Sequence, residues 1–268
     1  MTIQEFLAKG EELGGKAGVL GGIQDYFRSH GPRLHQSCER FGLFSERLGD
    51  VLELGPFYGY TPFLLRPRSF SYTVLEGDDP VVRPLEPLYR EHATALHYVD
   101  FFEMFGPTRS ATHKLPLPNA QFDTILCWET MEHFNFNPVG FVRELHRVLK
   151  PGGRVRITVP NKASFQNVAA LLTGRGEKAL IENYYHFENT MLGGKKAFYG
   201  FHWREYTAPE LSRLFSNAGF QVQSCGTFNA FQGRRRIGAG RRMLRLLLRI
   251  TAPIFPRHRT HVYLVATR

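Results

Sequence analysis

Two carboxylates and an imidazole stand close together in 129-ETMEH-133, where the sequence first offers side chains able to do chemistry. An imidazole has an ordinary pKa of about 6.5, which suits a general base that removes a proton from a hydroxyl. His133 is therefore the first candidate base, although it could instead only orient its loop. We expect no bound metal. The alternative is a divalent ion shared by Glu129, Glu132 and His133.

An aromatic stretch at 163–206 contains two further candidate bases, His186 and His202. Its Phe, Tyr and Trp residues suit the wall of a substrate pocket for a sugar ring, a quinone-like ring or a lipid chain. A small hydrophobic cap with no ligand would have the same composition. The stretch therefore does not identify a substrate.

The segment 51-VLELGPFYGYTPFLL-65 has the composition of a nucleotide-binding turn. An apolar run leads through Glu53 to Gly55 and Gly59, and glycine lets a backbone turn tightly and approach a ligand closely. About 20 residues later a second apolar run ends in Glu76, where an acid suits the two hydroxyls of a ribose. An ordinary strand–turn–helix would have the same glycines, but the acid at this distance favours a nucleoside site.

The elements that must position these residues are short strands that alternate with helices. Strands are predicted at 51–54, 72–76, 96–100, 122–127, 155–159, 220–223 and 261–266, and helices at 61–65, 139–149 and 208–217. Residues 22–48 have helical spacing that is expected to break around Gly31 and Pro32. Alternation implies crossover connections, hence a parallel α/β sheet that is covered on both faces.

Four collinear segments, which together span about residues 50–225, resemble the class I S-adenosylmethionine-dependent methyltransferases, in particular the type 11 group. They are the turn at 53–59, 115-LPLPNAQFDTILCWETMEHF-134, 148-VLKPGGRVRITVPN-161 and 204-REYTAPELSRLFSNAGFQV-222. The resemblance implies a Rossmann-like, doubly wound, mostly parallel seven-stranded sheet with its last strand antiparallel and helices on both faces. A nicotinamide dehydrogenase shares the sheet, but 150-KPGG-153 and Glu132-His133 have no place in its pattern.

The same resemblance implies S-adenosylmethionine as the cofactor. The family's acid-x-Gly-x-Gly-x-Gly motif has Phe57 in place of its central glycine here, with Pro56 before it. Glu76 matches the ribose-binding acid, and Asp100 with Phe101 matches the position near the adenine. The expected cofactor-binding residues are Glu53, Gly55, Pro56, Phe57, Gly59, Tyr60, Glu76, Gly77, Asp100, Phe101, Cys127, Trp128 and Glu129.

Methyl transfer from a sulfonium is an in-line displacement, so the enzyme mainly aligns the acceptor and excludes water. A hydroxyl acceptor additionally needs a base. We expect an O-methyltransferase acting on a small molecule, or on a glycan or lipid-linked glycan, with His133, His186 and His202 as candidate catalytic residues. N- or C-methylation of a natural product and an RNA-binding methyltransferase-like protein are the alternatives.

The positive charge of the chain is concentrated in one segment. The net charge of the 268 residues is +10, and nine arginines with no acid fall between Arg234 and Arg259. Leucines and arginines at 241–250 have the pattern of a basic amphipathic helix that contacts an anionic membrane surface. The alternatives are packing on the protein's own core and, least favoured, nucleic-acid binding, since the basic run lacks interleaved aromatics.

Cysteine content and hydropathy indicate the cellular compartment in which the protein works. Cys38, Cys127 and Cys225 form neither a disulfide framework nor a Cys-x-x-Cys pair. No signal peptide and no membrane-spanning run are expected. We predict a cytoplasmic protein, which the membrane interpretation of 241–250 would place on the inner face of the membrane. The expected domains are a helical cap at 1–49, a cofactor-binding core at 50–161, an acceptor-side cap at 162–206, and the end of the sheet at 207–268 with a basic insertion at 234–259.

Overall fold

A computed structural model describes residues 1–16, 22–57, 60–80, 82–107, 112–174, 185, 191–192, 195–196, 201–230 and 255–268. The helices in these ranges are α1 (Ile3–Lys16), α2 (Gly22–Arg40), α3 (Tyr60–Leu65), α4 (Glu86–His92), α5 (Phe101–Phe105), α6 (Pro138–Val148), α7 (Phe165–Leu172) and α9 (Ala208–Asn217). The strands are β1 (Gly49–Leu54), β2 (Ser69–Gly77), β3 (Ala95–Val99), β4 (Phe122–Trp128), β5 (Leu149–Pro160), β6 (Met191–Leu192), β7 (Lys195–Lys196), β8 (Gln221–Phe228) and β9 (His261–Thr267).

Seven strands form one sheet in the order β3-β2-β1-β4-β5-β9-β8. Strands β1 to β5 are parallel to one another, and β9 runs antiparallel to both β5 and β8. The predicted Rossmann-like fold with an antiparallel last strand is therefore confirmed. The chain builds the sheet outward from β1 to β3 in one direction and from β4 to β5 in the other, after which β8 forms the far edge and β9 lies between β5 and β8. In such sheets a ligand binds beyond the carboxyl ends of the strands, where the order reverses.

Successive side chains of the central strands supply two separate hydrophobic cores. In β4, Ile125 and Cys127 belong to the core that also includes residues of α6 and α9. Leu126 and Trp128 belong to the second core, which is shared with residues of α1 to α4. Because side chains alternate between the faces of a strand, this division places helices on both faces, as predicted for a doubly wound sheet.

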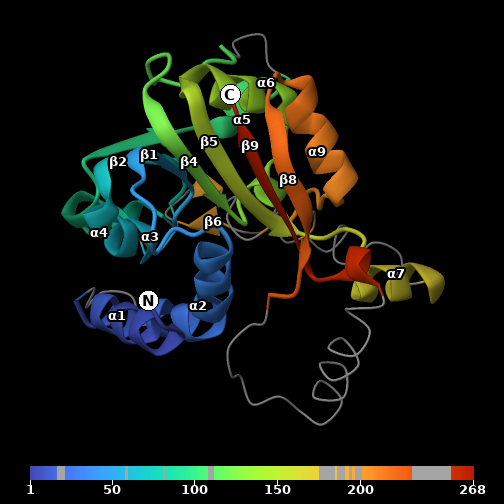
Figure 1. Cartoon of the computed structure of the whole chain (residues 1–268), viewed down its shortest axis with the longest axis horizontal. Coiled ribbons are helices and arrows are strands. Elements are labelled where there is room, and N and C mark those ends of the chain that lie inside the picture. Colours follow the sequence, from blue (N-terminus) through green and yellow to red (C-terminus); the bar gives the residue numbers. More distant parts are fainter. Residues whose placement is uncertain are drawn as a thin grey trace.

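Helices α1 and α2 pack against each other beyond the ends of the strands (Figure 1). Helix α2 runs through Pro32 without interruption, so the prediction of a break near Gly31 and Pro32 is wrong. A Cβ on Gly31 would lie 3.1 Å from Leu7 of α1. The close packing at this glycine helps to hold α2 together across a residue that cannot donate a backbone hydrogen bond.

Within the described ranges, no helix combines the length and the apolar character needed to cross a membrane. Most of the basic segment predicted at 234–259 lies outside those ranges, which resume at residue 255. Residues 256–258 form a short 3-10 helix, η4 (Pro256–His258), that leads into β9.

Candidate active site

A cavity of about 350 Å³ lies beyond the carboxyl ends of β1, β2 and β4, at the point where the strand order reverses. Helix α2 contributes part of its wall, and the turns that follow β1, β2, β3 and β4 contribute most of the remainder. Most of the predicted cofactor-binding residues line it, namely Gly55, Pro56, Phe57, Tyr60, Glu76, Gly77, Asp100, Phe101, Trp128 and Glu129. Parallel strands bring these residues together because their carboxyl ends share one edge of the sheet.

Two residues of left-handed backbone conformation shape the turn after β1. Gly55 has a φ of 59°, and Phe57 has a φ of 49°. A Cβ on Gly55 would lie 2.9 Å from Cγ2 of Thr130, so a larger residue does not fit without movement. The left-handed conformation of Phe57 is one that glycine adopts freely, and it costs a residue with a side chain about 1–2 kcal/mol. The turn thus forms without the central glycine. Gly59 lies outside the described residues.

Glu53 and Cys127 do not line the cavity, although both were predicted among the cofactor-binding residues. Glu53 is fully buried and accepts hydrogen bonds from the hydroxyls of Thr61 and Tyr72, the latter at 2.6 Å. Burial raises the pKa of Glu53 to about 7. Glu53 therefore connects β1 to α3 and β2 through these hydrogen bonds, behind the turn. Cys127 is buried in the core on the α6 side of the sheet.

Glu76 near the end of β2 reaches the cavity with a carboxylate that also holds the turn. Its Oε2 accepts hydrogen bonds from the Phe57 N–H at 3.2 Å and the Tyr89 hydroxyl at 3.1 Å, and its Oε1 accepts one from the Gly77 N–H at 2.9 Å. A carboxylate has about four acceptor positions, so the described residues leave one for a ligand hydroxyl. Burial raises the pKa of Glu76 to about 7, although the two N–H donors act in the opposite direction.

The end of β3 adds an acid and an aromatic ring to the cavity wall. Asp100 caps α5 by accepting a hydrogen bond from the Glu103 N–H at 2.8 Å. The ring of Phe101 is half-buried beside Phe134 and Phe141. Phe101 therefore presents a fixed apolar surface of the kind that suits a planar base.

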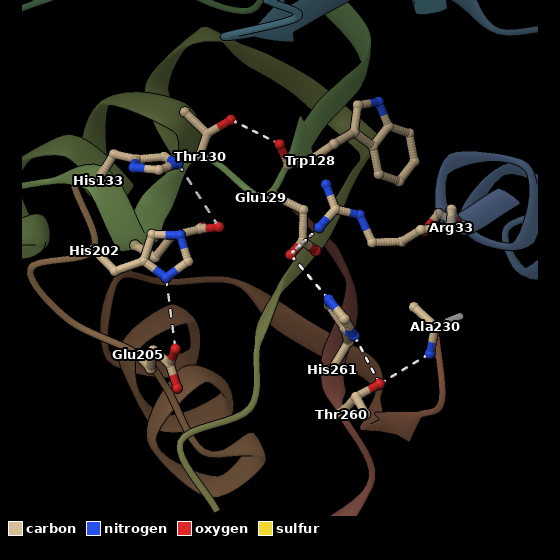
Figure 2. A network of polar contacts seen from close by, with 12 residues as sticks. Arg33, Trp128, Glu129, Thr130, His133, His202, Glu205, Ala230, Thr260 and His261 are labelled. Carbon is tan, nitrogen blue, oxygen red and sulfur yellow. Dashed lines mark hydrogen bonds and ion pairs between the residues drawn. The ribbon is translucent and has the colours of Figure 1, made fainter. Parts of the chain in front are cut away.

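Glu129 is held by side chains from two distant elements (Figure 2). Its Oε2 lies 3.4 Å from Arg33 of α2 and 3.3 Å from His261 of β9. Burial alone would raise the pKa of Glu129, but His261 and Arg33 outweigh burial and lower it below its ordinary value. Arg33 and His261 were not predicted as site residues, because no local pattern connects them to residue 129.

The short helix η3 (Met131–His133) brings Glu132 and His133 next to His202. Nδ1 of His133 donates a hydrogen bond to the Phe201 carbonyl at 2.8 Å, and its Nε2 lies 4.0 Å from Oε1 of Glu132. The rings of His133 and His202 stand edge to face with centroids 5.0 Å apart. Burial lowers the pKa of His133 to about 4, which leaves the imidazole neutral at pH 7. Burial and the charge of Glu129 raise the pKa of Glu132 well above its ordinary value.

Two of the three candidate bases, His133 and His202, therefore line the same cavity, and His186 lies outside the described residues. The structure does not bring together Glu129, Glu132 and His133, the three residues of the alternative metal site. Glu132 and His133 lie with His202, whereas the Glu129 carboxylate faces Arg33 and His261.

Residues 26–224 match the family of methyltransferase domains. A probable S-adenosylmethionine-dependent methyltransferase of Mycolicibacterium smegmatis is 29% identical over 184 residues, which are 69% of this chain and 56% of that protein. A probable S-adenosylmethionine-dependent methyltransferase of Mycobacterium tuberculosis is 30% identical over 181 residues, 67% of this chain and 52% of that protein. The chain thus spans about half the length of these relatives.

The fold is also that of known methyltransferases. A crystal structure of an S-adenosylmethionine-dependent methyltransferase from Archaeoglobus fulgidus superposes with a TM-score of 0.56 at 11% identity, covering 93% of this chain and 100% of that one. The residues present fit the cofactor, because the turn has no room for a Cβ at Gly55 and Glu76 keeps an acceptor position at the cavity. With a methyltransferase match over most of its length, this chain belongs to the class I S-adenosylmethionine-dependent methyltransferases.

Proposed function

We propose that this protein methylates a hydroxyl group of a small molecule, or of a glycan or lipid-linked glycan. S-adenosylmethionine, when bound, supplies a methyl group on a positively charged sulfur. In this proposal Glu76 accepts a hydrogen bond from a ribose hydroxyl, the turn at Gly55 lets the backbone approach the ligand, and Phe101 covers the adenine. The acceptor then takes the part of the cavity beside His133 and His202.

The observation that supports a hydroxyl acceptor is the position of His133 on the same cavity as Glu76. Its Nδ1 carries the proton that is donated to the Phe201 carbonyl, so the neutral ring has its lone pair on Nε2. A hydroxyl must lose its proton before or during methylation, and a lone pair at the cavity wall can accept it. The proposed base is therefore Nε2 of His133.

The acceptor class can be tested with the methyl-labelled cofactor and fractionated extracts of small molecules, glycans and lipids. The label is expected on an oxygen of the product. Replacing His133 with Ala should reduce turnover by about 100-fold or more, whereas His97→Asn in β3, away from the cavity lining, should leave it unchanged. Label found only on nitrogen or carbon would contradict the hydroxyl acceptor.

We also propose that the segment 234–259 attaches the protein to an anionic membrane surface. The support is the sequence itself, in which Arg241, Arg242, Arg245 and Arg249 recur among leucines. Each arginine near such a surface contributes about 1 kcal/mol of attraction. In flotation with anionic vesicles the wild type should rise and a variant with these four arginines changed to Glu should not. Equal flotation of the two proteins would contradict the attachment.

A further inference from the structure

Glu132, His133 and His202, called here the Glu–His–His cluster, each offer one donor atom, and these atoms lie within 4.8 Å of one another. Ligands bound to one transition-metal ion at about 2.1 Å stand roughly 3.0–3.5 Å apart. The Nε2–Oε1 separation between His133 and Glu132 is 4.0 Å. This pair would have to close by about 0.5–1 Å around an ion, and donor atoms as far apart as 4.8 Å would have to close by up to about 1.8 Å to complete a site.

Both imidazoles have the outer contacts that are typical of metal-binding histidines. Nδ1 of His133 donates to the Phe201 carbonyl at 2.8 Å, and Nδ1 of His202 lies 3.5 Å from Oε1 of Glu205 (Figure 2). Glu205 is itself fixed by Asn167, whose Nδ2 donates to Oε2 at 2.7 Å. Histidines that bind metals usually donate their other ring N–H to a carbonyl or carboxylate, which sets Nε2 as the ligand atom.

The carboxylate of the cluster is buried and incompletely satisfied. Glu132 is 1% exposed, and its Oε2 has no hydrogen-bond partner within the described part of the chain. A buried oxygen without a partner is unfavourable by about 1–3 kcal/mol, and a cation would remove that penalty. The Glu132 carbonyl accepts a hydrogen bond from the Trp203 N–H at 2.8 Å, which ties η3 to the segment that carries His202.

We infer that the Glu–His–His cluster binds one divalent transition-metal ion of the Zn²⁺, Co²⁺ or Fe²⁺ class. Two imidazoles and one carboxylate suit these ions, whereas Mg²⁺ and Ca²⁺ prefer oxygen ligands alone. His202 is partly exposed to solvent, with 42% of its side-chain surface accessible, and this provides a path for the ion.

The inference rests on the proposed hydroxyl acceptor and changes how that hydroxyl is activated. An acceptor oxygen in an open position on the ion would have its pKa lowered by the positive charge, and its proton would pass to water. His133 would then serve as a ligand, and the ion would take over the task proposed above for its Nε2.

The test is a titration of chelator-treated protein with Co²⁺, followed by calorimetry and by the visible absorption of the bound ion. Wild type should bind one equivalent. His202→Ala should weaken Co²⁺ binding by at least about 10-fold, and Glu205→Gln, which removes the negative charge of an outer contact, by about 10-fold. His97→Asn should bind as the wild type does. The absence of stoichiometric binding, or equal affinity in wild type and His202→Ala, would overturn the inference.

Binding of S-adenosylhomocysteine to the same samples separates this inference from the proposed function. Protein that binds the nucleoside but not Co²⁺ would refute the metal site and leave the methyltransferase proposal intact. Because His202 is partly exposed, its replacement should preserve the fold. If His202→Ala binds the nucleoside with unchanged affinity, the variant is folded.

Discussion

At the scale of single residues, two effects act in opposite directions on the pKa of Glu76. Burial raises its pKa to about 7, whereas a ribose that donates hydrogen bonds favours the ionised form. Ligand binding should therefore lower the pKa and release a proton below neutral pH. We expect the affinity for S-adenosylhomocysteine to rise between about pH 6 and about pH 8. Calorimetry in buffers of different ionisation enthalpy measures the released proton.

The control for this prediction is Glu76→Gln, which keeps the size of the side chain but cannot ionise. Its nucleoside affinity should be at least about 10-fold lower, since a charge-assisted hydrogen bond contributes roughly 1.5–3 kcal/mol. It should also lose the pH dependence. The same pH dependence in the variant and the wild type would assign the released proton to another group.

Gly55 permits a second prediction at this scale. In Gly55→Ala the new Cβ would meet Cγ2 of Thr130 at 2.9 Å, in addition to the strain of a φ of 59°. We expect loss of nucleoside binding and a melting temperature lower by several degrees. Gly152→Ala is a matched control, because Gly152 has a φ of 77° but no described residue within 4 Å of the added Cβ. That variant should lose about 1 kcal/mol of stability and keep binding. Equal binding by both variants would refute the proposed role of the turn.

Residues at strand ends could be predicted from the sequence, because strand alternation fixes which edge they occupy. Gly55 and Glu76 are examples. Glu53 could not be placed by the same reasoning, because its contacts with Thr61 and Tyr72 depend on how α3 and β2 pack. His202 likewise reaches His133 through the backbone contact between Glu132 and Trp203, which no local pattern reveals.

At the scale of elements, α2 closes one side of the cavity, and Arg33 fastens it to Glu129 at the end of β4. Arg33→Ala should weaken this attachment, since it removes a cationic partner of a buried carboxylate, at about 1–3 kcal/mol. We expect faster hydrogen exchange in 22–40 and weaker nucleoside binding. Arg47→Ala, at an exposed position, should change neither. Unaltered exchange in Arg33→Ala would contradict the role of the contact.

The strands of the sheet were predicted well, because apolar runs bounded by turns are a strong local signal. Helix α2 was not, because a Gly–Pro pair favours a break and only the packing against α1 overrides it. The predicted helix at 208–217 is confirmed with its cap, where Thr207 and Glu210 exchange hydrogen bonds. Local signals thus identified elements but not the tertiary contacts that extend them.

At the scale of the whole molecule, two buried carboxyls should make stability depend on pH. Glu53 and Glu76 both have a pKa raised from 4.5 to about 7. Because the folded pKa is the higher one, their contribution is fully present below about pH 4.5 and is lost as pH rises through about 7. The melting temperature of the ligand-free protein should therefore fall between about pH 5 and about pH 8.

Thermal melts at a series of pH values provide the measurement, with Glu53→Gln as the comparison. The variant cannot ionise at this position, so its melting temperature should fall less over the same interval. The free energy of unfolding of the variant should decrease less steeply than that of the wild type, by up to about 1.4 kcal/mol per pH unit. Identical slopes for the two proteins would show that Glu53 does not ionise in the folded state over this range.

We propose that Glu76 binds the adenosine of the cofactor and that the amino-acid part of the cofactor lies over the Gly55 turn. A structure of the complex with S-adenosylhomocysteine is the most direct test. We expect the ribose hydroxyls to contact the Glu76 carboxylate and the sulfur to face the side of the cavity that holds His133 and His202. A nucleoside bound elsewhere, or a Glu76 side chain turned away from the sugar, would contradict the assignment.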